Sequence, residues 1–230
     1  MANILMNLTK MKNELPERDD YEFYETPTAV IDQCNRLLFD YLMDRHFFQP
    51  IAMLDMGADR GQWGQSWLKN QDVGKTFVPQ TMAGIELREM PKPEPYNSWY
   101  SPYSVEDYDL MRYFAEDIAQ HQGIAFGNPP YLRTWSEKKK AYINDGKAMT
   151  EFVYRCIRHF RVVAFLLRND FQESSMRYKR IFQHEDCAEI HTSVKRINFV
   201  GRGNAQYRAF AFYIFSRYNT DYTQHRWFNR

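Results

Sequence analysis

The sequence is poor in cysteine and has no long apolar run. Its three cysteines, Cys34, Cys156 and Cys187, are widely spaced among 230 residues and form no CxxC pair. This usage argues against a disulfide framework or a zinc site and favours the reducing cytosol, so we expect a cytoplasmic protein. No apolar stretch approaches the roughly 18–20 residues that a membrane-spanning helix needs. Residues 1–20 are polar and do not resemble a secretory signal, so we expect a flexible N-terminal segment.

Patterns that bind metals or phosphates are also missing. The six histidines show no spacing typical of metal ligands, so we expect no metal site. The glycine-rich segment 54–64 (LDMGADRGQWG) does not have the dinucleotide GxGxxG spacing, and no Gly-Lys-Ser/Thr follows it. A phosphate-binding P-loop is therefore not supported.

The apolar residues form short runs separated by helical patterns. Hydrophobic residues make up 44% of the chain and aromatic residues 17%, which excludes a disordered protein. Strands are predicted at 51–54, 82–85, 124–127, 161–167 and 209–215, and helices after Thr26-Pro27, around 63–68, at 150–160 and at 174–182. This alternation predicts a mostly parallel α/β sheet with helices on both faces, in a single domain over residues 21–230. Loop-rich insertions are expected at 87–113 and 132–149.

The net charge of +1 hides an uneven distribution of charged residues. Residues 1–130 carry 11 Lys and Arg against 20 Asp and Glu, a balance of −9. Residues 131–230 carry 19 against 9, a balance of +10. Two interpretations stay open: a chance scatter of solvated charges, or a basic surface in the second half that binds a polyanion.

Three of the predicted strands end in residues that can contact a ligand. Asp55 and Gly57 follow the first strand, Glu86 follows the second and Asn128 follows the third. Ligands of open α/β sheets bind beyond the carboxyl ends of the strands, where glycine allows a sharp turn and an acid can accept hydrogen bonds from ribose hydroxyls. Taken alone, the glycine-rich turn and Glu86 also fit a structural turn and a surface acid.

The tetrapeptide Asn128-Pro129-Pro130-Tyr131 (NPPY) is the most specific motif in the chain. At average composition it should occur by chance in about one chain per thousand of this length. Two prolines stiffen the backbone, so the carbonyls of the Asn128 side chain and of Pro129 can accept both hydrogens of one exocyclic amine. Tyr131 offers a flat face on which a base can stack. We therefore predict a site for the amine of a nucleobase, with a rigid Pro-Pro turn as the structural alternative.

The order of these motifs resembles a known enzyme family. NPPY after an apolar strand, preceded by Tyr24–Pro27 (YETP) and the glycine-rich segment, is similar to the γ-class DNA N6-adenine methyltransferases. Segments 85–100, 162–174 and 195–215 extend the likeness to small methyltransferases of phages and prophages, over about residues 21–217. The resemblance implies a Rossmann-like fold with a mostly parallel seven-stranded sheet, S-adenosylmethionine as cofactor, no metal, and duplex DNA with a flipped adenine as substrate. It also implies a place in the bacterial host cytosol or nucleoid and a role in protecting phage DNA from restriction.

Matched position by position, the resemblance implies a set of site residues. The cofactor-binding residues would be Tyr24, Thr26, Pro27, Asp55, Gly57, Ala58, Glu86, Leu87, Asp117, Ile118 and Asn128. The catalytic residues would be Asn128, Pro129, Pro130 and Tyr131, with Phe199 beside the flipped base or, equally, in the core. Candidates for phosphate contacts are Arg133, Lys138, Lys139, Lys140, Lys195, Arg196, Arg202 and Arg208, for which a solvated face is the alternative.

Several alternatives stay open at this point. The same site geometry fits N4 of cytosine, RNA or a glutamine side chain of a protein, and a methyltransferase-like chain can also serve as a DNA-binding subunit. No insertion is large enough for a target recognition domain. Sequence specificity would then be weak, or would come from loops 87–113, 132–149 and 200–208 or from a separate specificity subunit. A homodimer stays open as the oligomeric state.

Overall fold

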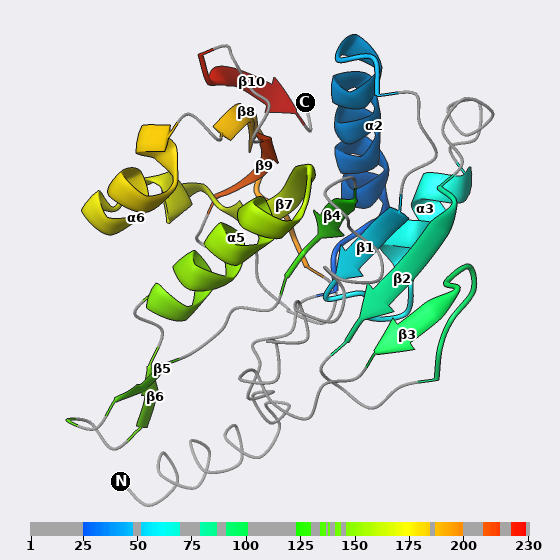
Figure 1. Cartoon of the computed structure of the whole chain (residues 1–230), viewed down its shortest axis with the longest axis horizontal. Helices are drawn as coiled ribbons and strands as arrows, with labels where there is room; N and C mark the ends of the chain where they lie inside the picture. The colour runs from blue at the N-terminus through cyan, green and yellow to red at the C-terminus, as the bar shows by residue number, and fades with distance from the viewer. Residues whose placement is uncertain are drawn as a thin grey trace, which may run out of the picture.

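A central sheet of eight strands organises the part of the chain that the structure describes. The computed structural model covers residues 25–47, 52–69, 79–86, 91–100, 123–129, 134–136, 138, 141–143, 146–184, 187–199, 209–216 and 222–228. The strands are β1 (Ala52–Met56), β2 (Thr81–Ile85), β3 (Ser98–Tyr100), β4 (Ile124–Gly127), β7 (Val162–Arg168), β8 (Cys187–Ser193), β9 (Phe210–Ser216) and β10 (Gln224–Phe228). Their order in the sheet is β10-β8-β9-β7-β4-β1-β2-β3 (Figure 1).

The sheet is mostly parallel, as the sequence predicts. Only β9 runs antiparallel, to β7 on one side and β8 on the other. Seven of the strands match the expected seven-stranded sheet, and β10 adds an eighth at the edge, parallel to β8. A separate two-stranded antiparallel sheet consists of β5 (Thr134–Ser136) and β6 (Ala141–Ile143).

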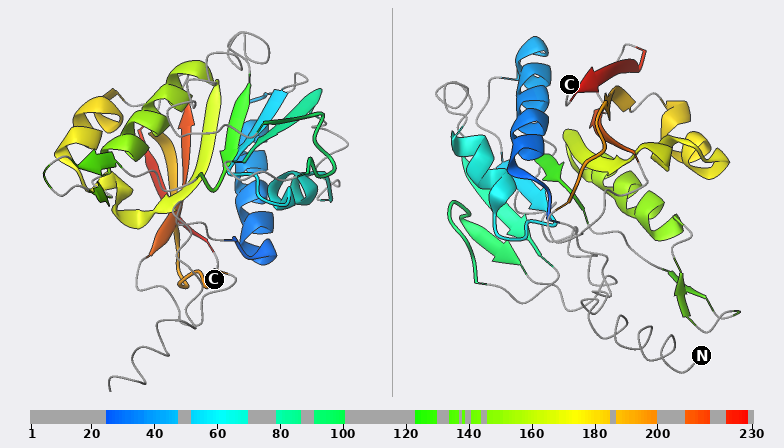
Figure 2. Two further views of the ribbon diagram at one scale, coloured as in Figure 1. Left: turned by 90° about the horizontal axis from the view of Figure 1, so that it is seen from below. Right: turned by 180° about the vertical axis from the view of Figure 1, so that it is seen from behind.

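Helices cover both faces of the sheet (Figures 1 and 2). On one face lie α2 (Thr28–Asp44) and α3 (Gln62–Lys69), where the ring of Trp63 in α3 stacks on Phe212 of β9 at 6.3 Å. On the other lie α5 (Lys147–His159) and α6 (Ser175–Arg180), where Phe152 of α5 stacks on Phe165 of β7 at 5.8 Å. Short 3-10 helices, η2 (Asn169–Gln172) and η3 (Phe182–His184), flank α6.

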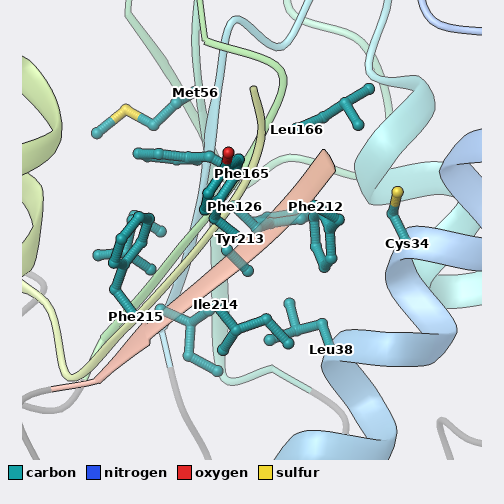
Figure 3. Close-up of a cluster of buried hydrophobic side chains, with 14 of the residues drawn as sticks. Cys34, Leu38, Met56, Phe126, Phe165, Leu166, Phe212, Tyr213, Ile214 and Phe215 are labelled. Carbon is teal, nitrogen blue, oxygen red and sulfur yellow. The ribbon is translucent and has the colours of Figure 1, made fainter. Parts of the chain in front are cut away.

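The hydrophobic core explains why β7 and β9 are continuous apolar runs. Residues 162–167 and 210–215 are all buried, because each strand has helices on both of its faces. Side chains from β4, β7 and β9 meet Leu38 of α2 in the same cluster (Figure 3). None of the described helices is long and apolar enough to cross a membrane.

Several strands carry no clear signal in the sequence. The expected insertion 87–113 contains β3, which pairs with β2 and extends the sheet, and the insertion 132–149 contains β5, β6 and the start of α5. β8 was also missed, because buried polar Glu189 and His191 interrupt its apolar residues. β10 was missed because four of its five residues are exposed. The predicted flexible segment 1–20 lies outside the described residues.

Candidate active site

Three adjacent parallel strands end at the same edge of the sheet. β1 pairs with β2 and with β4, and Asp55 lies in register with Gly84 on one side and Phe126 on the other. The residues that directly follow these strands, Gly57, Glu86 and Asn128, are therefore neighbours although they are far apart in sequence. This is the edge at which the sequence predicts a ligand.

The glycine-rich turn after β1 is tied to the end of β2. The backbone amides of Gly57 and Ala58 both donate to the Ile85 carbonyl, at 3.0 and 2.9 Å. Gly57 has a φ of +79°, and a Cβ added there would lie 2.6 Å from the backbone oxygen of Asn128. Glycine is therefore required at position 57 both by its backbone conformation and by the contact between the turns after β1 and β4.

Glu86 lies directly beside this turn. Its side chain is 4% exposed, and its Oε2 accepts a hydrogen bond of 2.9 Å from the backbone amide of Asp59. Asp59 has a φ of +44°, a left-handed conformation that Asp adopts more readily than most residues. The sequence GADRG thus forms a turn whose third residue is held by the acid at the end of β2.

Asn128 connects the turn after β4 to the start of α2. Its Nδ2 donates to Oγ1 of Thr26 at 3.1 Å, across 102 positions of sequence. Thr26 is buried, and the next residue, Pro27, caps α2 with its carbonyl accepting from the amides of Val30 and Ile31. The Thr26 contact directs the amide nitrogen of Asn128 toward α2.

Asp55 lies beneath the glycine-rich turn and is bonded to Tyr96. The carboxyl group is fully buried, and the Tyr96 hydroxyl donates to its Oδ2. Burial is the main cause that raises the pKa of Asp55 to about 8; the Tyr96 hydrogen bond opposes this rise, and the Glu86 and Asp59 carboxylates add to it. A carboxyl group with this pKa is mainly protonated at pH 7, and it contacts the segment that holds the glycine-rich turn through Tyr96.

Tyr96 is a residue of the candidate site that the sequence motifs do not indicate. It lies in the predicted insertion 87–113, and its side chain is only 1% exposed. Burial and the nearby Asp55 raise the pKa of its hydroxyl above the usual value, so the proton stays on Tyr96. An aromatic residue between prolines and a short strand, in the segment PKPEPYNSWY, is the signal that could have marked it.

The structure brings together part of the predicted cofactor and substrate sites. Thr26, Pro27, Asp55, Gly57, Ala58, Glu86, Asn128 and Pro129 are described and lie on the three turns at this edge or on the adjoining start of α2. Tyr24, Leu87, Asp117, Ile118, Pro130 and Tyr131 lie outside the described residues. Their roles stay predictions.

The predicted DNA-contacting residues are described only in part. Lys138, Lys195 and Arg196 are exposed. Phe199 is 1% exposed and packs against Phe210 with its ring centroid at 4.8 Å, so it occupies the core position that the sequence left open. Arg133, Lys139, Lys140, Arg202 and Arg208 lie outside the described residues. Among the residues that are described, no three His, Cys, Asp or Glu side chains are grouped as metal ligands.

Comparisons with known proteins identify the fold. No family model matches the sequence, and no curated protein matches it. The structure is similar to that of a Listeria monocytogenes protein assigned to the class I S-adenosylmethionine-dependent methyltransferases, with a TM-score of 0.59, 10% identity, and coverage of 98% of this chain and 71% of that one. It is also similar to the methyltransferase subunit of a type I restriction-modification system from Streptococcus thermophilus, with a TM-score of 0.58, 14% identity, and coverage of 85% and 45%.

A third similar structure comes from a larger enzyme. It is a nuclease-deletion mutant of the Type ISP restriction-modification enzyme LlaGI in complex with a DNA substrate mimic, with a TM-score of 0.59 and 11% identity. The match covers 99% of this chain and 29% of that one. Together with the strand order and the one antiparallel strand of the described eight-stranded sheet, these likenesses show that the chain has the Rossmann-like fold of S-adenosylmethionine-dependent methyltransferases.

Proposed function

We propose that this chain transfers a methyl group from S-adenosylmethionine to the exocyclic N6 of adenine in DNA. The observation that carries the proposal is the place of Asn128: it follows β4 at the ligand-binding edge, its amide nitrogen is directed to Thr26, and its backbone touches the glycine-rich turn. The residue that we propose to bind the target amine thus adjoins the turn that we propose to bind the cofactor. The fold and the NPPY motif support the same activity.

The residues at this edge fit S-adenosylmethionine. The close approach of the turns at Gly57 and Asn128, and a buried carboxylate at the end of β2, are what a nucleoside with ribose hydroxyls needs. Glu86 would hold the ribose, and the turn at Gly57 and Ala58, with Thr26 and Pro27, would hold the methionine part. When bound, the cofactor supplies an electrophilic methyl group on a sulfonium. Tyr24, Leu87, Asp117 and Ile118 complete the proposed cofactor site.

Asn128 and Pro129 would bind the target amine. An exocyclic amine is a poor nucleophile because its lone pair is delocalised into the ring. Two carbonyl acceptors favour a pyramidal nitrogen and stabilise the positive charge that develops on it during attack. Fixing the amine next to the methyl group lowers the entropic part of the barrier. Pro130 would stiffen this turn, and Tyr131 would stack on the base.

Duplex DNA would have to release the adenine from the base stack. Flipping a base costs a few kcal/mol, which stacking on Tyr131 and phosphate contacts would offset. The exposed Lys138, Lys195 and Arg196 belong to the basic second half of the chain and are suited to such contacts. Arg133, Lys139, Lys140, Arg202 and Arg208 are the further candidates, and Phe199 would have to leave its core position to reach a base.

The test is nucleoside mass spectrometry on DNA from a bacterial host that lacks its own adenine methylase and expresses this chain. We expect abundant N6-methyladenine, and none when Asn128→Ala is expressed at the same level. N4-methylcytosine instead would identify cytosine as the target base. Absence of both modified bases, from a chain that is expressed and folded, would contradict a DNA methyltransferase acting alone and favour an RNA or protein acceptor or a partner-dependent subunit.

A further inference from the structure

We propose that Tyr96 is a positioning residue of the cofactor site, which holds the glycine-rich turn in its binding geometry through Asp55. The inference rests on the proposed function, because it assumes that S-adenosylmethionine binds at this turn. It assigns a role to the connection between β2 and β3, which lies in the predicted loop-rich insertion 87–113.

The Tyr96 hydroxyl is hydrogen-bonded to the residues on both sides of the glycine-rich turn. It donates to Oδ2 of Asp55, at the end of β1, and accepts a hydrogen bond of 3.1 Å from the backbone amide of Gly64, in α3. Asp55 and Gly64 stand on either side of the turn at 57–61. With one hydroxyl bonded to both, the end of the strand and the start of the helix cannot separate without breaking a buried hydrogen bond.

Two glycines of the motif make room for Tyr96. A Cβ added at Gly61 would lie 2.7 Å from Cε2 of Tyr96, and one at Gly64 would lie 2.7 Å from its hydroxyl oxygen. Both distances are too short for real side chains. Glycines at these two positions therefore leave room for the Tyr96 ring. Gly61 is also favoured by its φ of +79°, and a Cβ at Gly64 would lie 2.6 Å from Sδ of Met82 as well. Gly57 serves the contact with Asn128.

Tyr96 is itself held firmly by its own segment. Its backbone carbonyl accepts from Nζ of Lys92 at 2.8 Å, and its amide donates to the Pro93 carbonyl at 3.3 Å. The next residue, Asn97, bonds Met82 of β2 twice, through its amide at 2.7 Å and its Oδ1 at 2.8 Å. The position of the ring is thus set by β2 and the segment that follows it. The hydrogen bond from Tyr96 therefore fixes the orientation of the Asp55 carboxyl group.

Asp55 also lies close to the turn after β4, where we propose that the target amine binds. A Cβ added at Gly127, which has a φ of +124°, would lie 2.7 Å from Oδ1 of Asp55. Gly127 directly precedes Asn128. Oδ2 of Asp55 therefore faces Tyr96, and Oδ1 faces the turn that contains Asn128. Two further carboxyl groups act on the pKa of Asp55: Glu86, at the end of β2, and Asp59, in the glycine-rich turn.

The experiment measures the Kd for S-adenosylhomocysteine by calorimetry in a double-mutant cycle of Tyr96→Phe and Asp55→Ala. Tyr96→Phe removes both bonds of the hydroxyl, the one to Asp55 and the one from the Gly64 amide, and should weaken binding roughly tenfold. If Tyr96 acts through Asp55, the double variant should bind about as weakly as Asp55→Ala alone. The matched control is Tyr213→Phe, which removes another buried hydroxyl, bonded to the Asn169 carbonyl at 2.9 Å, and should leave the Kd within about twofold.

The pH profile of binding separates positioning from a general loss of stability. In the wild-type chain the plot of log Kd against pH should bend as Asp55 ionises, and Tyr96→Phe should move this bend to higher pH because it removes a bond that favours the ionised form. The ligand titrates identically with every variant, so the difference belongs to the protein. A wild-type Kd and pH profile in Tyr96→Phe, or multiplied losses in the double variant, would overturn the inference. Absence of binding by the folded wild-type chain would instead overturn the proposed function.

Discussion

The buried Asp55 carboxyl makes a quantitative prediction about stability and pH. Its pKa is about 8 in the folded chain, because of burial, and about 3.9 in an unfolded chain. Between these values the folded state binds one more proton than the unfolded state, so the free energy of unfolding falls as pH rises, by about 1.4 kcal/mol per pH unit. The stability contribution is complete below pH 4 and is lost as pH approaches 8.

Asp55→Asn removes this dependence because an amide does not ionise, while its oxygen can still accept from Tyr96. Urea unfolding at pH 5, 6 and 7 should show that the difference in unfolding free energy between the wild-type chain and Asp55→Asn changes by roughly 3 kcal/mol over these two pH units. Titration of all other groups cancels in the difference.

The control is Asp40→Asn, an exposed carboxylate whose side chain is 51% accessible and which pairs with Arg36. Its effect should stay within a few tenths of a kcal/mol at all three pH values, roughly the strength of a surface ion pair. A pH-independent difference for Asp55→Asn as well would refute the reasoning, because it would mean that Asp55 is ionised in the folded chain throughout this range.

Three further predictions concern the site and its surroundings. Gly57→Ala should lower the unfolding free energy by about 2–3 kcal/mol in urea, since it combines a left-handed backbone with a 2.6 Å approach to the Asn128 oxygen; a loss below 0.5 kcal/mol would contradict the contact. Tyr131→Ala should reduce the fluorescence increase of 2-aminopurine placed at the target base, and an unchanged signal would argue against stacking. Arg177→Met should lower the unfolding free energy by roughly 2 kcal/mol and speed hydrogen exchange in α6, because Arg177 bonds Thr150 and the carbonyls of Asp170 and Phe171. These bonds matter because α6 buries no residue, and the exposed Lys179→Met is the control.

The sequence by itself determined the strands that position the site. β1, β2, β4, β7 and β9 are short apolar runs because strands covered on both faces bury nearly every residue, and that pattern is local. The ends of β2 and β4 were equally clear, because Glu86 and Asn128 interrupt those runs. The end of β1 was not, because the strand continues through the buried Asp55 to Met56. Parallel strands place their carboxyl ends together, so the location of the candidate site followed from the fold class alone.

Only the tertiary structure decided which side chains meet. The bond between Asn128 and Thr26 spans 102 positions, and that between Tyr96 and Asp55 spans 41. No local pattern encodes such pairs, because they depend on how β3 extends the sheet and how α2 packs on it. The edge strand β10 was hidden for a related reason: an exposed strand has no buried face to give it an apolar period, and its pairing with β8 stabilises it instead. The glycine spacing shows the same limit, since Gly61 and Gly64 leave room for Met82, Pro93 and Tyr96, which come from another part of the chain.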